Sequence, residues 1–217
     1  MRLNFLKTNV FILIVLAALT GLQGRAICAQ RNPGSAEYKE YNVKAAFIYN
    51  FIKFTDWPDD IPAESNTITI GILGDDPFGN SFSAVENTFI KGKKLIIKRF
   101  GRFSDLCKNG DNKEKNTCAA SDILKKCHLL FVCKSEKEQL EQIIGTVASD
   151  SILTVGEYDG FIEAGGIINL IPFENKIAFE ISMVAAKKAN LKISSQVLRL
   201  AKRVISKEAA EAEPPAK

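Results

Sequence analysis

The histidine, serine, cysteine and acidic residues of this chain do not form any recognisable catalytic motif. The single histidine, His128, opens an apolar segment that we predict to be a strand, and no Gly-x-Ser-x-Gly sequence is present. Nucleophilic catalysis needs a serine or cysteine beside a base that a third group orients. The acidic residues available for a carboxylate pair are Glu157, Asp159, Glu163 and Glu180. The sequence does not show that any two of them face each other, so we predict no catalytic residues. The alternative is a hydrolase that uses two of these acids.

Phosphate and metal sites have equally little support. The segment IGILGDDPFG at 70–79 places three glycines between a predicted strand and a predicted helix, but their spacing is not Gly-x-Gly-x-x-Gly. Asp75 and Asp76 would repel a pyrophosphate at the start of that helix. The chain contains no Cys-x-x-Cys pair to hold zinc. We therefore expect neither a cofactor nor a metal.

The cysteines suggest a disulfide. Cys127 and Cys133 bracket HLLFV, and six residues of extended strand separate them by about 20 Å, whereas a disulfide needs Cα atoms within about 7 Å. Cys107 and Cys118 flank the polar segment KNGDNKEKNT, whose asparagine, glycine and aspartate residues favour turns. In an exported protein we expect a disulfide between Cys107 and Cys118.

Residues 1–29 have the pattern of a signal peptide. Basic residues near the start precede an apolar run from Val10 to Leu19, and small residues follow at Ala26 and Ala29, with no acidic residue among them. Ten apolar residues are too few for a transmembrane helix, which needs about 20. We expect an exported protein that does not itself span the membrane. Cleavage would remove three basic residues and lower the formal charge from +4 to about +1, which gives no reason to expect nucleic-acid binding.

The remainder predicts one α/β domain over 37–206, between a polar linker at 30–36 and a charged tail at 207–217 that we expect to be disordered. We predict strands at 67–73, 94–100, 128–132, 151–155, 166–171 and 176–181. We predict helices at 37–54, 79–89, 135–148, 182–189 and 194–205, with a short helical turn at 159–162. This alternation indicates a mainly parallel sheet with helices on both faces, whose last two strands form an antiparallel hairpin around residues 172–175.

The first helix is the most unusual segment. In VKAAFIYNFIKFTDWP, at 43–58, the polar residues Lys44, Asn50 and Lys53 form no single stripe at 100° per residue, so we predict cover on more than one side. The two lysines are expected to keep their ammonium groups in water. Trp57 lies at a corner before a proline, where an interface anchor is common. We expect a partner or a second copy in a homodimer to contact the aromatic residues Phe47, Phe51, Phe54 and Trp57.

A ligand cleft is a separate possibility. In the strand IAFEI, alternation places Glu180 on the face opposite Phe179, and a carboxylate near a sheet core must find a partner or stay exposed. We consider Asn50, Arg102 and Glu180 as candidates for lining a small-molecule cleft. The adjacent glycines Gly165 and Gly166 indicate a positive φ or a close backbone approach.

Five segments together resemble the YfiR/HmsC family of exported bacterial regulators. They are VKAAFIYNFIKFTDWP, ITIGILGDDPFG, CHLLFV, ILTVGEYDGFIEAGGIINL and IAFEISMVAAKKANLKISSQVLRLA. The likeness runs from about Val43 to Ile205 and keeps order and spacing. Ser182 stands where the family often has asparagine. Residues 105–122 look like a local insertion, so disulfides of the family do not carry over.

The resemblance implies a periplasmic α/β protein without catalytic chemistry. Members of the family restrain an inner-membrane diguanylate cyclase by binding its periplasmic portion, which lowers cyclic di-GMP and biofilm formation. A membrane histidine kinase or another sensor is an equally open partner here. The alternative function is a periplasmic small-molecule sensor module for such a kinase or cyclase. In either case a redox or ligand signal is expected to release the partner.

Overall fold

The computed structural model describes residues 33–58, 66–108 and 119–206, and the structural statements that follow concern those residues. The predicted signal peptide, the C-terminal tail and Cys118 lie outside them. The helices are α2 (Pro33–Lys53), α3 (Phe103–Lys108), α4 (Ala119–Leu124), the 3-10 helix η1 (Lys134–Gln139), α5 (Leu140–Val147), α6 (Met183–Lys188) and α7 (Ser195–Leu198). The first helix therefore begins at Pro33, within the segment predicted as a linker.

The main sheet has eight strands, in the order β10-β8-β7-β6-β5-β2-β4-β3. They are β2 (Thr67–Leu73), β3 (Phe89–Ile90), β4 (Lys93–Phe100), β5 (Leu129–Val132), β6 (Leu153–Gly156), β7 (Ile168–Phe173), β8 (Lys176–Ser182) and β10 (Arg203–Ile205). Strands β4, β2, β5, β6 and β7 run parallel, and β7 and β8 form an antiparallel hairpin. The predicted α/β class with a mainly parallel sheet and a C-terminal hairpin is confirmed.

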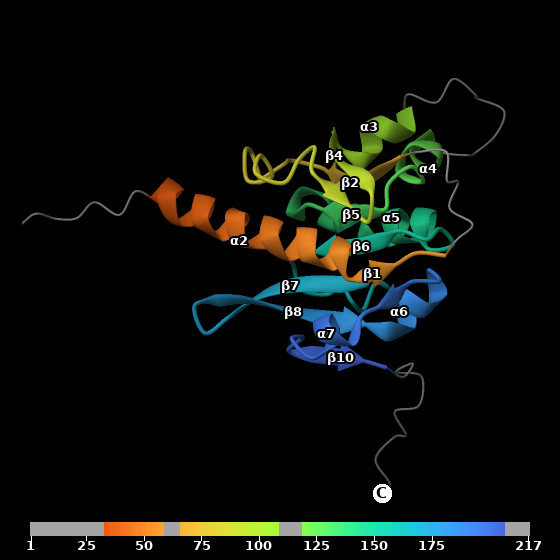
Figure 1. The fold of residues 1–217 in the computed structure, drawn as a ribbon. Coiled ribbons are helices and arrows are strands. Elements are labelled where there is room, and N and C mark those ends of the chain that lie inside the picture. The colour runs from red at the N-terminus through yellow and green to blue at the C-terminus, as the bar shows by residue number, and fades with distance from the viewer. Residues whose placement is uncertain (1–32, 59–65, 109–118, 207–217) are drawn as a thin grey trace, which may run out of the picture. The chain divides into compact units, whose positions relative to one another are not determined.

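Helices cover both faces of this sheet because its central strands are apolar on both sides. On one face, alternate residues of β2, such as Ile70 and Ile72, join a core with Phe51 of α2 and Ala186 of α6. On the other face, residues such as Leu130 join a second core with α4 and α5. This two-sided burial is typical of parallel strands. The long helix α2 runs beside the sheet in Figure 1.

The helix predicted at 79–89 is wrong. Residues 79–87 form successive turns, and β3 follows. The turns are closed by hydrogen bonds to the carbonyl three residues earlier, such as that from Ser81 N to Phe78 O. Phe78 and Phe82 are both buried, so their spacing of four imitates a helical face. The backbone at Gly79 (φ +50°) and Asn87 (φ +65°) has left-handed geometry that an α-helix does not contain.

The helix predicted at 194–205 is also too long. Helix α7 ends at Leu198, and the chain then returns to the sheet, where Lys202 N donates to Phe179 O and β10 pairs in parallel with β8. The apolar spacing in this segment fits a helix, but the open edge of β8 offers the backbone another set of partners. A second, unpredicted pairing joins β1 (Thr55–Asp56) to β9 (Lys192–Ile193), which ties the end of α2 to the segment after α6.

Candidate functional site

The predicted contact residues on α2 lie mostly against the protein's own core. Phe51 is only 2% exposed, and its ring centroid lies 4.9 Å from that of Phe179 in an edge-on contact. Phe47 is half-buried and packs on both of these rings, at 5.9 Å from Phe51 and 5.5 Å from Phe179. Assigning Phe51 to a partner surface was therefore wrong, because the sheet already covers it.

Phe54 and Trp57 are half-buried and pack against the same core. The Trp57 ring lies 5.9 Å from that of His128, edge-on. We expected α2 to carry more apolar surface than one chain can cover. For its aromatic rings this expectation is wrong, because they pack against the core of the same chain. Contact of a partner with the exposed parts of Phe47, Phe54 and Trp57 stays a proposal.

The outer face of α2 is a single stripe, contrary to the sequence prediction. Its members are spaced by three or four residues and are all exposed; they are Lys39, Val43, Ala46, Asn50 and Lys53. We call these five residues the α2 stripe. Val43 is 46% exposed, which is high for a branched apolar side chain. The side-chain amide of Asn50 donates to Ala46 O of the same helix at 2.8 Å, so it spans no cleft.

Lys44 breaks the predicted pattern because it points inward. It is 3% exposed, and its ammonium group binds Glu157, which is 6% exposed and directly follows β6. Its Nζ atom also lies 2.5 Å from Glu40 Oε1 and 4.4 Å from the centroid of the Tyr41 ring. Tyr41 Oη donates to Glu157 Oε1 at 3.0 Å. This cluster fixes α2 to the carboxyl end of the central sheet.

Two further acidic residues at this end of the sheet, Asp75 and Asp76, are engaged as well. Arg102 Nη2 lies 3.1 Å from Asp75 Oδ2, and Arg99 Nε lies 2.7 Å from Asp76 Oδ2. A Cβ atom on Gly74 would lie 2.4 Å from Ser135 Oγ, so the turn after β2 has no room for a side chain at this position.

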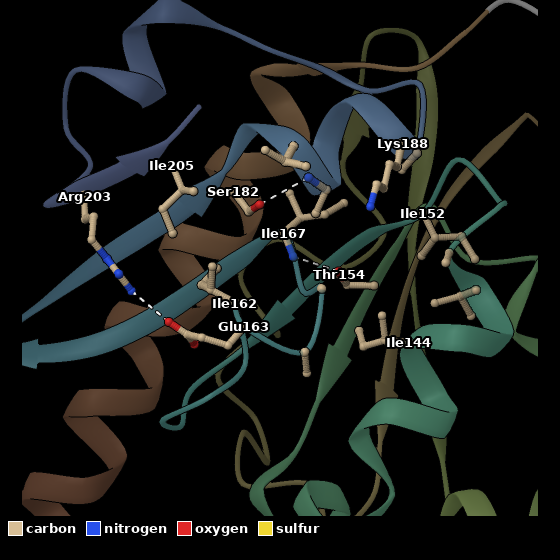
Figure 2. Close-up of a pocket in the computed structure, with 17 residues that line it drawn as sticks. Ile144, Ile152, Thr154, Ile162, Glu163, Ile167, Ser182, Lys188, Arg203 and Ile205 are labelled. Carbon is tan, nitrogen blue, oxygen red and sulfur yellow. Dashed lines mark hydrogen bonds and ion pairs between the residues drawn. The ribbon is translucent and has the colours of Figure 1, made fainter. Parts of the chain in front are cut away.

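A cleft of about 540 Å³ lies elsewhere, between α5, the segment at 162–167, α6 and β10 (Figure 2). Its polar side chains are Thr154, Glu163, Ser182, Lys188 and Arg203, and the rest of its wall is mostly aliphatic. Thr154 Oγ1 accepts a hydrogen bond from Ile167 N at 3.0 Å. Ser182 Oγ accepts from Ala185 N at 3.2 Å and caps α6.

Arg203 organises one end of the cleft. Its guanidinium binds both carboxylate oxygens of Glu180, at 2.8 and 2.9 Å, and its Nη2 atom also reaches Glu163 Oε1 at 3.3 Å. The hydrogen bonds to Glu180 raise the pKa of Arg203 above its ordinary value. Glu180 thus has the partner that a half-buried carboxylate requires, and it borders the cleft through Arg203.

The three predicted cleft residues do not come together. Arg102 follows β4 and Glu180 lies on β8, with β7, β6, β5 and β2 between these strands, and Asn50 lies on the outer face of α2. The polar residues that do line the cleft were missed. Alternation in β8 places Ser182 on the same face as Glu180 and would have indicated that residue. Arg203 was missed because the sequence placed it in a helix.

Cys127 and Cys133 are free, buried thiols on either side of β5. Burial raises the pKa of Cys127 to about 12, and burial together with nearby carboxylates raises the pKa of Cys133 further. Cys107 is half-buried and packs against the second core. Because Cys118 lies outside the described residues, the pairing of Cys107 with Cys118 stays a prediction.

The described part of the chain contains neither a candidate metal site nor a candidate membrane-spanning helix. No group of three or more histidine, cysteine, aspartate or glutamate side chains within 33–58, 66–108 and 119–206 could hold a metal ion. In the same ranges no helix is both long enough and apolar enough to cross a bilayer.

A model of the YfiR/HmsC-like family matches residues 41–202, which covers almost all of the domain described above. The class that the fold defines is an α/β domain with a mainly parallel sheet, and the family match shows that this chain belongs to the YfiR/HmsC-like family. Members of that family are regulators, typically periplasmic, in cyclic di-GMP signalling.

Solved structures give more distant likenesses. A conserved domain protein from Vibrio cholerae O1 biovar eltor shares 15% identity at a TM-score of 0.47. The ABC domain from Streptococcus pneumonia, in complex with L-Trp, shares 13% identity at a TM-score of 0.48. Each match covers 76% of this chain, which spans only 60% of either protein. The comparison with curated proteins gives no match.

Proposed function

We propose that the protein is a non-enzymatic periplasmic regulator that binds and restrains an inner-membrane signalling protein, in the first place a diguanylate cyclase. The observation that carries this proposal is the family match over residues 41–202. A histidine kinase is the alternative partner. Binding would stabilise the inactive state of the partner. The ratio of inactive to active partner would then rise by up to the factor by which the regulator binds the inactive state more tightly.

The α2 stripe is the part of the described surface that we assign to this contact. It combines Val43 and Ala46 with polar neighbours, which is the composition of a non-obligate interface rather than of a core. The exposed edges of Phe47 and Phe54 adjoin it. The cluster of Lys44, Tyr41 and Glu157 holds the helix in place, so a partner would meet a preformed surface and lose little affinity to ordering.

Co-purification from membranes tests this assignment. The tagged mature protein is expressed in its native host, and detergent-solubilised membranes are captured on it under oxidising and reducing conditions. We expect recovery of an integral protein that contains a cyclase or kinase domain. Val43→Asp should reduce that recovery at least tenfold, because a new charge would be buried in the contact.

The matched control is Leu200→Asp. Leu200 is 73% exposed and lies after α7, away from the α2 stripe in sequence. This variant should retain the partner. Recovery of no integral signalling protein under either condition, or equal loss with both variants, would contradict the assignment of the α2 stripe.

The cleft beside β10 favours a second candidate function, a small-molecule sensor module for the membrane protein. Its volume of about 540 Å³ falls within the usual range of ligand sites, and it combines an apolar wall with a few polar groups. The two functions are compatible, since a ligand that alters the regulator can release its partner. A thermal-shift screen of small metabolites tests the sensor function, and we expect stabilisation by at least one class.

A further inference from the structure

The wall of the cleft beside β10 has an unusual composition. Isoleucine, valine and alanine side chains dominate it, and none of the described residues that line it is aromatic. Ile144 and Val147 come from α5, whereas Val184 and Ala185 come from α6. Flat rings are usually held by stacking against aromatic side chains, which this wall does not offer. An aliphatic group gains the same stabilisation from any apolar surface that it covers.

The charged groups of the cleft are separated along its length. Figure 2 shows Arg203 joined to Glu163 at one end and Lys188 at the other, extending from α6. Glu180, which accepts two hydrogen bonds from Arg203, completes the charged groups of the Arg203 end. Both carboxylates are thus engaged with one guanidinium. The end formed by Lys188 carries a cation, and an ammonium group has three N–H donors with which to bind more than one acceptor.

Hydroxyl groups lie between these ends. Thr154 and Ser182 each accept one backbone N–H group, and each hydroxyl also carries a proton of its own to donate. A ligand that enters the cleft therefore meets an aliphatic wall, two hydroxyl donors and an ammonium group. These features complement an aliphatic chain that ends in an oxygen-rich anion.

We propose that this cleft binds an aliphatic carboxylate, whose carboxylate group pairs with Lys188 and whose hydrocarbon chain lies against the side chains of α5 and α6. This proposal deepens the sensor function and rests on it. An aliphatic amine bound in the same direction would place its cation beside Lys188, and an aromatic acid would find no ring to stack on. A free fatty acid has both of these parts, whereas the acyl chain of a membrane phospholipid is esterified and offers the hydrocarbon chain without the carboxylate.

Direct binding of decanoate to the purified mature protein tests the proposal. Titration calorimetry below the concentration at which decanoate forms micelles should give a saturable heat, and the protein should melt at a higher temperature with the ligand bound. The comparison ligands are 1-decanol, which lacks the charge, and 3-phenylpropionate, which has a ring in place of the chain. Decanoate should bind at least tenfold more tightly than either of them.

Two pairs of variants locate the site. Lys188→Gln should weaken decanoate binding about tenfold and leave 1-decanol binding unchanged, because it removes a charge-assisted contact only. Its control is Lys187→Gln, an exposed neighbour that does not line the cleft. Ala148→Trp places a ring in the cleft from the exposed end of α5 and should abolish binding. Gln142→Trp, elsewhere on the exposed side of α5, should not.

Vesicles distinguish the two sources of the chain. Sedimentation with phosphatidylglycerol vesicles that Ala148→Trp abolishes would show that the cleft takes an esterified acyl chain, which has no carboxylate, and decanoate binding without sedimentation would identify a free acid. The second result supports the proposal when the variants behave as stated, and the first would overturn it. Absence of saturable binding, binding that all four variants share, or tighter binding of 3-phenylpropionate would overturn it. Stabilisation by another class of ligand would then leave the sensor function standing without this proposal.

Discussion

Tyr41 donates a hydrogen bond of 3.0 Å to Glu157 across 116 residues of sequence, and Lys44 binds the other oxygen of the same carboxylate. Burying this ion pair costs desolvation energy that the attraction between the two charges barely offsets. The pair therefore orients α2 more than it adds to the net stability of the fold. It fixes the rotation of α2 about its own axis. The α2 stripe faces outward because Lys44 faces inward.

Removing Lys44 should destabilise the fold strongly. In Lys44→Met, Glu157 keeps only the Tyr41 hydroxyl as a polar partner from α2 and stays buried, which should lower the free energy of unfolding by about 3 kcal/mol. Glu157→Gln should cost less, because Lys44 retains Glu40 at 2.5 Å. Urea unfolding followed by circular dichroism measures both changes. An equal cost for the two variants would show that Glu40 does not compensate.

The stability of the protein should fall in weak acid through His128. Burial, followed by the nearby charge of Lys93, lowers the pKa of His128 from 6.5 to about 4. Its Nδ1 atom accepts Thr69 N at 3.2 Å, which a protonated ring could not do. The unfolded chain therefore binds the proton more readily. The stabilisation is fully present above about pH 6.5 and is lost as the pH falls toward 4, by about 3 kcal/mol in total.

The control for this prediction is His128→Gln, which keeps an acceptor near Thr69 but does not titrate. Unfolding free energies between pH 7 and pH 4 should vary less in this variant than in the wild-type protein. Parallel pH profiles for the two proteins would show that His128 does not titrate in this range.

The ring of Phe161 should make Gly166 intolerant of any side chain. A Cβ atom on Gly166 would lie 2.2 Å from this ring, and one on Gly156 would lie 2.3 Å from it. Gly166→Ala should lower the unfolding free energy by about 1–3 kcal/mol, because the fully buried ring must shift. A double-mutant cycle with Phe161→Leu should recover part of that loss. Additive effects would place the cause elsewhere.

Cys127 and Cys133 should resist thiol reagents in the native state. Both are at most 4% exposed, and burial raises the pKa of Cys127 to about 12, so neither forms much thiolate at neutral pH. Alkylation followed by peptide mapping should modify them only in denaturant. Modification of either residue at a rate independent of denaturant would show local opening around β5.

Local patterns in the sequence predicted most of the sheet but not the features that depend on distant contacts. The apolar run TITIGIL became β2, which is buried on both faces, and KLIIKRF became most of β4, which is buried on one face. The adjacent glycines behaved as predicted: Gly165 has φ +97°, and Gly166 closely approaches Phe161. Strand β10 escaped prediction because its partner, β8, rather than its own spacing, determines its conformation.

The position of Lys44 shows why the candidate site was only partly predictable. A lysine in an apolar helix is expected at the surface, and only the approach of Glu157, 113 residues later, makes its burial possible. Placing Lys44 inside moves Val43 outside, which converts the predicted absence of a stripe into the α2 stripe. The aromatic residues of α2 were predicted to contact a partner, but the sheet, with Phe179, covers much of the surface of Phe47 and Phe51.

The cellular concentration of cyclic di-GMP tests the central claim most directly. In a strain that lacks the native gene, expression of the wild-type protein should lower cyclic di-GMP and surface-attached growth several-fold. Val43→Asp, exported and folded to the same level, should leave both near the level of the empty strain, whereas Leu200→Asp should act like the wild type. Unchanged cyclic di-GMP with the wild-type protein, together with unchanged output from every membrane kinase recovered with it, would contradict the account.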